Sequence, residues 1–418
     1  MKELIRGNLI EAPALGRLRC LEGGYLALED GVVRGVYDRL PDEWAEVAVT
    51  DYGDRLILQA FTDAHLHAPQ YPMLGTGMDL PLLDWLNTYA FPVEARFSDP
   101  EYARRVYRAL ARELLDLGTT RVIMFSSLHT DGTLILMEEL EAAGLSGCVG
   151  KVNMDRNGGV NLQETTEESQ AETLRWLAGC GRFRNIKPIL TPRFTPSCTD
   201  ELMAWLGELA NERGLCVHSH LSENTGELAL VKQLHPDCPQ YWETYAKYGL
   251  WKDHTVMAHC VYSDEQERQA MKDANVLAVH CPDSNINISS GIAPVRQMLE
   301  EGVWVALGSD IAGGAQLSML DVMTNAIRSS KARGLVTGDA PLTAPEAYYL
   351  GTSAGQQYFG AAPGFGLDEP LHAVVIDDSP LNPGGDSIPL SQRLERVLYR
   401  HGRAIIDAVY AAGRKVRG

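Results

Sequence analysis

The first residues along the chain whose type and spacing suggest a chemical role are His65 and His67, which form a His-x-His pair. The pair follows an apolar stretch, Leu56 to Phe61, that has the composition of a buried strand. Side chains two residues apart on an extended chain point to the same face, so both imidazoles would project together. A transition-metal site is one interpretation of this pair, and two solvated loop histidines are the other.

Three further polar residues, His220, His259 and Asp310, lie at the ends of later apolar runs. If these runs are parallel strands of one barrel, their carboxyl ends meet at the mouth where active sites are built. Neutral imidazoles and a carboxylate suit Zn²⁺ or Fe²⁺, and an open coordination position would hold a water molecule. The pKa of such a water falls from about 15.7 to about 7, which would provide hydroxide at neutral pH.

The elements that must position these residues alternate between short apolar runs and helix-like segments from about residue 56 onward. Pro100 predicts the start of one helix and Gly118 its end, and a helix over Val295 to Glu301 is expected to end at Gly302. Alternation of this kind is typical of a parallel (β/α)8 TIM-like barrel. The expected strands are Leu56 to Phe61, Thr119 to Phe125, Gly147 to Met154, Ile186 to Thr191, Leu215 to His220, Thr255 to Cys260, Val276 to Cys281 and Val303 to Gly308.

The two ends of the chain follow a different pattern. The first 55 residues contain short strand-like bursts broken at Gly23-Gly24 and at Asp30-Gly31, and the second of these is a hairpin-turn signal. Near the other end, Leu371 to Ile376 is expected to be a strand, and a final helix is expected near Gln392 to Ala412. The chain is therefore predicted to divide into a barrel over residues 56–365 and a small β-sandwich module, with the C-terminal helix, from residues 1–55 and about 366–418.

The composition excludes several classes of function. With 37 Lys and Arg against 55 Asp and Glu, the formal net charge is −18, which argues against nucleic-acid partners. The N-terminus carries early charges and no signal-like apolar region, and no apolar run is long enough to span a membrane. The eight cysteines are scattered, with no Cys-x-x-Cys, so reduced thiols and a cytoplasmic location are expected.

The strand-end pattern His-x-His, His, His, Asp resembles the amidohydrolase superfamily in its mononuclear metal deaminase branch. Additional motifs sharpen this resemblance to the guanine deaminase family, over roughly residues 55 to 360. The Ala-Pro-Gln and Pro-Arg-Phe elements are specific to that family within the superfamily. The motifs are His67-Ala-Pro-Gln-Tyr71, Asp79-Leu-Pro-Leu-Leu-Asp-Trp-Leu86, Pro192-Arg-Phe194, His220-Leu-Ser-Glu-Asn224, His280-Cys-Pro-Asp-Ser-Asn285 and Gly308-Ser-Asp-Ile-Ala-Gly-Gly314.

The resemblance implies one Zn²⁺ per chain, with Fe²⁺ as the alternative, held by His65, His67, His220 and Asp310. It also implies that Glu223 shuttles protons, because attack of hydroxide on a ring carbon needs one group to accept the water's proton and then deliver it. His259 would lie against the metal-bound water or the substrate, so the implied catalytic residues are Glu223, His259 and Asp310. The implied substrate-binding residues are His67, Gln70, Arg193, Phe194, His220, Glu223 and Asp310.

Arg193 carries the prediction about the substrate. Its planar fork of donors suits two adjacent acceptors, and guanine offers O6 and N7 on one edge. Adenine would present an amino donor there, and a donor facing a buried donor is costly. Without the family resemblance, Arg193 would be interpreted as a surface salt bridge, Phe194 as a core residue and Gln70 as a loop residue.

The predicted reaction is therefore the hydrolysis of guanine to xanthine and ammonia by a homodimer. The alternatives are deamination of a related pterin, 8-oxoguanine or triazine, and, from another class, a catalytically silent scaffold of the same fold. His218 and His280 are expected to pack against or support the site rather than bind metal. Lys151 and Lys187 are expected at strand beginnings, which disfavours a lysine bridging two metal ions and favours a single ion.

Overall fold

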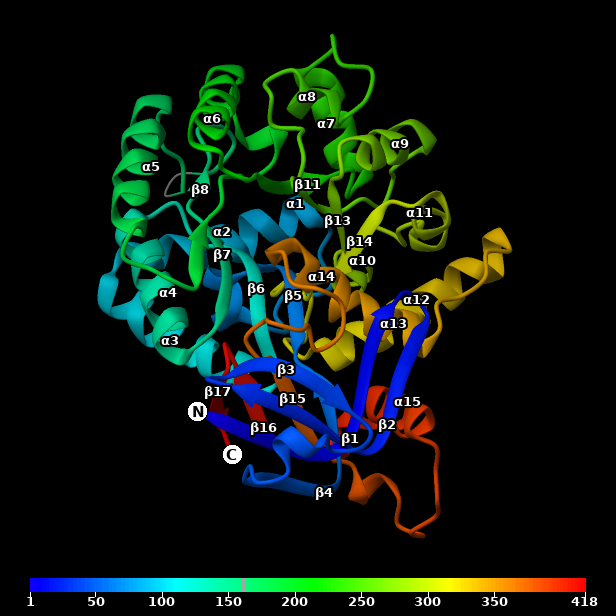
Figure 1. Cartoon of the computed structure of the whole chain (residues 1–418). Helices are drawn as coiled ribbons and strands as arrows, with labels where there is room; N and C mark the ends of the chain where they lie inside the picture. Colours follow the sequence, from blue (N-terminus) through cyan, green and yellow to red (C-terminus); the bar gives the residue numbers. More distant parts are fainter. Residues whose placement is uncertain (160–161) are drawn as a thin grey trace.

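The computed structural model describes residues 1–159 and 162–418, and it places the two ends of the chain side by side in one sheet (Figure 1). This sheet has seven strands in the order β17-β16-β15-β4-β1-β2-β3. β1 pairs parallel with β4 and antiparallel with β2, while β15 joins the C-terminal strands to β4. The strands are β1 (Lys2–Ala14), β2 (Arg17–Glu29), β3 (Val32–Tyr37), β4 (Val49–Gln59), β15 (Ala373–Asp377), β16 (Ile405–Ala411) and β17 (Arg414–Arg417).

The hairpin between β2 and β3 has the predicted turn. Asp30 and Gly31 have φ values of 52° and 79°, and Glu29 pairs directly with Val32. Two positive φ values in a two-residue loop match the right-handed twist of the flanking strands. The predicted break at Gly23-Gly24 is wrong, because β2 runs through these glycines and absorbs them at a register shift in its pairing with β1.

Two four-stranded parallel sheets, β5-β6-β7-β9 and β11-β12-β13-β14, and a two-stranded parallel sheet, β10-β8, form the rest of the strand framework. A parallel bridge between Leu190 and Val217 connects the first sheet to the second. At the other side, the Asp310 N–H donates to the His65 carbonyl (2.9 Å), so the segment after β14 lies against β5. The strands are β5 (Phe61–His67), β6 (Thr119–Phe125), β7 (Ser146–Gly150), β8 (Val152–Asn153), β9 (Ile186–Pro188), β10 (Thr191–Pro192), β11 (His218–Leu221), β12 (Val256–His259), β13 (Leu277–His280) and β14 (Trp304–Leu307).

Seven of the eight strands predicted for this framework are confirmed, with ends shifted by a few residues. The first is wrong. Leu56 and Ile57 belong to β4 and pair with β1 and β15, whereas the framework strand is β5, which contains both His65 and His67. The apolar run continues across Ala60 with no turn residue, so its composition does not mark where one sheet ends and the next begins.

Helices connect and cover these strands. Pro100 is the first residue of α3, and the Asp99 side chain caps this helix by accepting from the Glu101 N–H. α11 spans the predicted residues and ends at Gly302, which has φ +83°. The longer helices are α3 (Pro100–Asp116), α4 (Thr130–Ala143), α5 (Thr166–Cys180), α6 (Asp200–Arg213), α7 (Thr225–Leu234), α9 (Glu265–Asp273), α11 (Val295–Glu301), α12 (Met319–Thr337), α13 (Ala344–Leu350) and α15 (Leu390–Arg400).

The predicted final helix over residues 392–412 is only half correct. α15 ends at Arg400, and Ile405–Ala411 forms β16, which pairs antiparallel with β15. The β-branched residues Ile405, Ile406 and Val409 favour a strand once a partner edge is present. The module is thus one mixed sheet with a helix against it, and its description as a sandwich stays a prediction.

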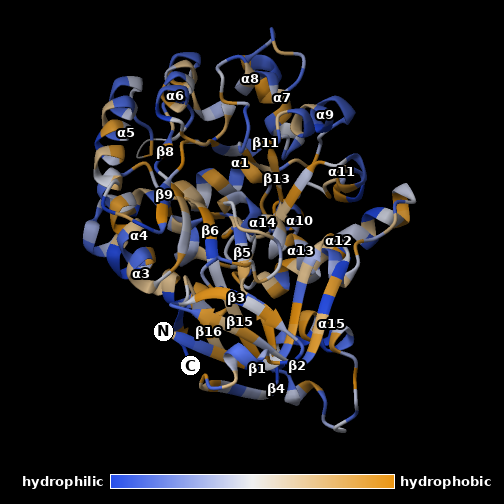
Figure 2. Ribbon diagram, viewed as in Figure 1, coloured by the Kyte–Doolittle hydropathy of each residue, from blue (hydrophilic) through white to orange (hydrophobic). Residues whose placement is uncertain are grey.

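Apolar residues concentrate on the strands, while the outward faces of the surrounding helices are polar (Figure 2). The largest buried cluster includes residues of both four-stranded sheets and of the helices around them. Among the described residues, no helix combines the length and the apolar character needed to cross a bilayer. All eight cysteines are free thiols.

Candidate active site

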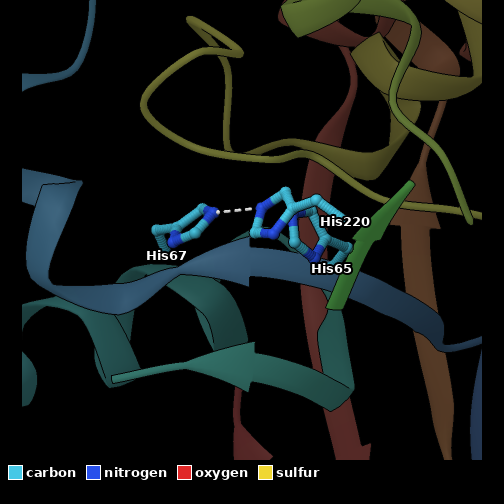
Figure 3. A group of neighbouring side chains, drawn as sticks. All are labelled: His65, His67 and His220. Atoms are coloured by element: carbon cyan, nitrogen blue, oxygen red, sulfur yellow. Dashed lines mark hydrogen bonds between the residues drawn. The ribbon is translucent and has the colours of Figure 1, made fainter. Parts of the chain in front are cut away.

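Three imidazoles from two strands point toward one another at the carboxyl ends of β5 and β11 (Figure 3). The Nε2 atoms of His67 and His220 are 3.1 Å apart. The Asp310 Oδ1 lies 3.2 Å from Nε2 of His65 and 3.5 Å from Nε2 of His67. The structure therefore brings all four predicted ligands together, although nearly 250 residues separate the first from the last.

This cluster fits a metal ion better than it fits a set of mutual hydrogen bonds. The Nε2 atom of His65 and the Nδ1 atom of His67 are buried without a hydrogen-bond partner. Burial lowers the pKa of His65, His67 and His220 well below the usual value, and the neighbouring histidine rings disfavour a charge further, so the rings are neutral and carry free lone pairs. Three neutral imidazoles and one carboxylate match the ligand set of a transition-metal centre.

Hydrogen bonds on the far sides of the rings determine which nitrogen faces the centre. The His220 Nδ1 lies 2.5 Å from the backbone carbonyl of Arg193, which can only accept, so Nδ1 carries the proton and Nε2 is free. The His65 Nδ1 lies 2.7 Å from Nε2 of His218, a ring with no exposed surface. The prediction that His218 supports the site therefore has a specific contact behind it.

Glu223 and His259 lie next to the cluster, beside Asp310. The His259 Nε2 is 3.5 Å from Oε2 of Glu223 and 3.7 Å from Oδ2 of Asp310. The Oδ1 atom of Asn285 lies 2.8 Å from Nδ1 of His259, and this contact orients the ring. Burial, and then the nearby Asp310, raises the pKa of Glu223 well above its usual value, a shift that makes its carboxylate a stronger proton acceptor.

Two of these strand-end residues adopt left-handed backbone conformations. His259 has φ 74° and Asp310 has φ 46°. Such conformations cost residues other than glycine about 1–3 kcal/mol each and persist where the surrounding structure holds them. The close approach of β14 to β5 adds a further constraint, because a Cβ atom on Gly308 would lie 2.9 Å from the His65 carbonyl oxygen.

A pocket with about 390 Å³ of empty space opens beside the cluster. Gln70, Arg193 and Phe194, the three residues expected to contact a purine in addition to the metal-site residues, all line it. The apolar walls of the pocket suit a planar ring. The lining is His67, Gln70, Leu82, Trp85, Leu86, Arg193, Phe194, His220, Glu223, His259, Ile288, Asp310 and Gly313.

Glu94, at the end of α2 (Phe91–Glu94), is a residue that sequence reasoning missed. Its carboxylate accepts hydrogen bonds from both terminal nitrogens of Arg193 (2.7 and 3.0 Å) and from the Gln70 amide (2.7 Å). Only the motif around Trp85 pointed to this part of the chain, and nothing in its spacing indicated a partner for Arg193. The alternative that Arg193 forms a surface salt bridge is wrong, because Arg193 is only 3% exposed.

The placement of Lys151 corrects another prediction. Lys151 follows β7 rather than beginning a strand, and it is completely buried. Its ammonium group donates to Glu164 (2.7 Å) and to the Val152 carbonyl, so it is committed to an ion pair. Lys187 lies within the short strand β9 and is exposed.

Comparisons with known proteins agree with this geometry. The model of the Amidohydrolase family matches residues 56–369. A guanine deaminase from Dictyostelium discoideum is 34% identical over 99% of this chain and 98% of its own length, and one from Rattus norvegicus is 37% identical over 99% and 93%. A guanine deaminase from C. acetobutylicum, solved with guanine bound in its active site, has a TM-score of 0.96 and 39% identity, covering 99% of this chain and 100% of that chain. The chain therefore belongs to the amidohydrolase family.

Proposed function

We propose that this chain hydrolyses guanine to xanthine and ammonia at the His65–His67–His220–Asp310 cluster. The observation that carries the proposal is the direct continuity between this cluster and a pocket lined by Gln70, Arg193 and Phe194. The similarity to a structure solved with guanine in its active site supports the same conclusion, because the likeness extends over the whole chain.

The cluster suits one Zn²⁺, with Fe²⁺ as the alternative, because three imidazole nitrogens and a carboxylate oxygen are ligands that both ions accept. The two four-stranded sheets are proposed to close into a (β/α)8 barrel through the Leu190–Val217 bridge and the contacts between β14 and β5. Closure would explain why ligands from β5, β11 and the segment after β14 share one centre.

A metal ion bound here would lower the pKa of a water molecule and so provide a nucleophile at neutral pH. The pocket residues would hold the purine with C2 toward the cluster. Glu223 would accept the proton released when water adds to C2 and deliver it to the ring nitrogen. The second proton of that water, on the new C2 oxygen, would then pass through Glu223 to the amino group, which leaves as ammonia when the C2–N bond breaks. His259 and Asp310 lie close enough to Glu223 to orient the attacking water.

Arg193 would select a purine with an oxygen at C6. Glu94 takes one N–H from each terminal nitrogen, which leaves the Nε–H and the remaining terminal N–H groups for the ligand. These donors can pair with O6 and N7 of guanine, whereas the amino group of adenine would face them donor to donor. The backbone carbonyl of the same residue orients His220, so Arg193 contributes to both halves of the site.

The test is an ammonia-release assay with guanine, 8-oxoguanine, isoxanthopterin and melamine, with the products identified by mass. Guanine should have the highest kcat/KM and yield xanthine. If another compound is turned over fastest, guanine is not the preferred substrate, although the proposed hydrolytic deamination still stands. Purified protein with no bound metal and no turnover of any of them would identify a catalytically silent scaffold instead.

We also propose that the enzyme is a cytoplasmic homodimer. The end of α12 projects from the body of the molecule (Figure 1) and carries Leu335 and Val336, which are 90% and 88% exposed. Adjacent apolar side chains this exposed are typical of surfaces that contact another protein. The free thiols suit a reducing compartment.

A further inference from the structure

Glu94 holds Gln70 and Arg193, two of the polar residues that line the pocket, yet it does not line the pocket itself. The side chain is buried, with 1% exposure. One carboxylate oxygen accepts from Arg193 Nη1 (2.7 Å), and the other accepts from both Arg193 Nη2 (3.0 Å) and the Gln70 amide (2.7 Å). A single carboxylate thus connects segments that are distant in the sequence.

These contacts remove most of the freedom of Arg193 and Gln70. A two-point pairing between a planar guanidinium and a carboxylate sets the direction of all remaining N–H groups. The Phe91 ring lies against the same guanidinium, 5.1 Å from its central carbon. Gln70 is held at its other end, where its oxygen accepts from the Ala312 N–H (2.9 Å).

The charge of Glu94 matters as much as its shape. Arg193 is only 3% exposed, and a buried cation without a partner is strongly disfavoured. Pairing with Glu94 neutralises the guanidinium without using a charge on the ligand. The wall of the pocket therefore presents oriented N–H donors with no net charge, which suits a neutral ring with acceptor atoms and does not require an anionic one.

We propose that Glu94 is the specificity-determining positioning residue of this site, because it fixes which edge of Arg193 meets the oxygen at C6 of the purine. This inference rests on the proposed function. Glu94 does not touch the substrate, so its effect should be larger for ligands that offer Arg193 both the C6 oxygen and N7 than for ligands that offer N7 alone. 2-Aminopurine, which is guanine without O6 and retains the C2 amino group, is the matched probe.

The experiment compares kcat/KM for guanine and for 2-aminopurine in the wild type and in Glu94→Gln. The amide replaces one acceptor oxygen by a donor, so one terminal nitrogen of Arg193 meets another donor in either orientation, and the Gln70 amide also does so in one of them. A displaced contact group can cost about 100-fold in rate, and we expect kcat/KM for guanine to fall by about that factor. The value for 2-aminopurine should change by less than about threefold, so the preference for guanine is lost.

Two further variants keep the test sharp. Arg193→Met with Glu94→Gln should be no worse on guanine than Arg193→Met alone, because Glu94 acts through Arg193. Glu94→Asp keeps the charge and is one methylene shorter, so it should have an intermediate preference for guanine. If Glu94→Gln does not fold, an unchanged preference for guanine in Glu94→Asp overturns the inference. The control is Glu346→Gln, which breaks a two-point pairing with Arg296 away from the pocket; this pair is more exposed, at 14% for Arg296 and 12% for Glu346.

The outcomes separate the two claims. Equal losses on both purines, or no loss on either, would show that Glu94 does not set specificity while guanine hydrolysis by the wild type stands. Additive effects of Glu94→Gln and Arg193→Met would also overturn the inference. A wild type that forms no xanthine would refute the proposed function, and this inference with it. Metal content should stay unchanged in every variant.

Discussion

Replacement of His218 by leucine should weaken metal binding although His218 is not one of the proposed ligands. Its Nε2 lies 2.7 Å from Nδ1 of His65, and neither ring has exposed surface. For Nε2 of His65 to face a metal ion, its Nδ1 must carry the proton and donate it to His218. Leucine would leave that N–H buried without an acceptor.

The size of the effect follows from the cost of a buried unsatisfied donor. That cost is about 1–3 kcal/mol, which corresponds to roughly a 5- to 150-fold loss in affinity. Outer hydrogen-bond partners of metal ligands typically contribute about 10- to 100-fold, in agreement with this range. We therefore expect His218→Leu to raise the dissociation constant for Zn²⁺ by about 10- to 100-fold.

Competition with a chromophoric chelator measures the constant directly and does not depend on catalysis. His218→Gln should remain within a few-fold of the wild type, because the amide oxygen can accept the same hydrogen bond. His280→Leu is the control, since this buried ring ends β13, two strands from the His218 strand β11, and its Nδ1 has no partner. Wild-type affinity in His218→Leu, or equal losses in His218→Leu and His280→Leu, would refute the reasoning.

Three other perturbations give distinct results. Glu223→Gln should lower kcat by about 10²- to 10⁴-fold with metal content unchanged, because an amide cannot relay a proton, and near-normal turnover would exclude this role. Burial raises the pKa of Glu267 from 4.5 to about 7, so the folded state binds this proton more tightly than the unfolded state and loses stability as the pH rises from about 4.5 to 7. Glu267→Gln does not titrate and should therefore gain up to about 3 kcal/mol relative to the wild type between pH 4 and pH 8 in urea unfolding, whereas a pH-independent difference would contradict the assignment. Val336→Asp should shift the protein toward monomer in sedimentation equilibrium, and an unchanged mass would mean that this end of α12 is not the interface.

The ligands could be predicted from sequence because their positions follow a general rule. His220, His259 and Asp310 end or follow apolar runs, and the carboxyl ends of parallel strands converge regardless of sequence separation. The rule also explains why the error in the first predicted strand does not change the predicted ligands. Moving the strand from Leu56–Phe61 to β5 leaves His65 and His67 at the same edge.

The rest of the site depends on tertiary contacts that have no sequence period. Glu94 lies 99 positions from Arg193, and only the folded chain pairs them. The sequence over β16 (Ile405–Ala411) predicts helix, because its apolar residues are compatible with either element until β15 offers an edge. The predicted position of Lys151 is wrong because the apolar stretch over residues 147–154 breaks into two short strands. Lys151 therefore lies between the end of β7 and the start of β8.

The most direct test of the account is a metal titration of chelator-treated enzyme, with xanthine formation from guanine as the signal. Four ligands converging on one centre predict no turnover without metal and a linear recovery that stops at one Zn²⁺ per chain. Turnover that survives complete removal of the metal, or recovery that needs two ions per chain, would contradict a single metal centre formed by His65, His67, His220 and Asp310.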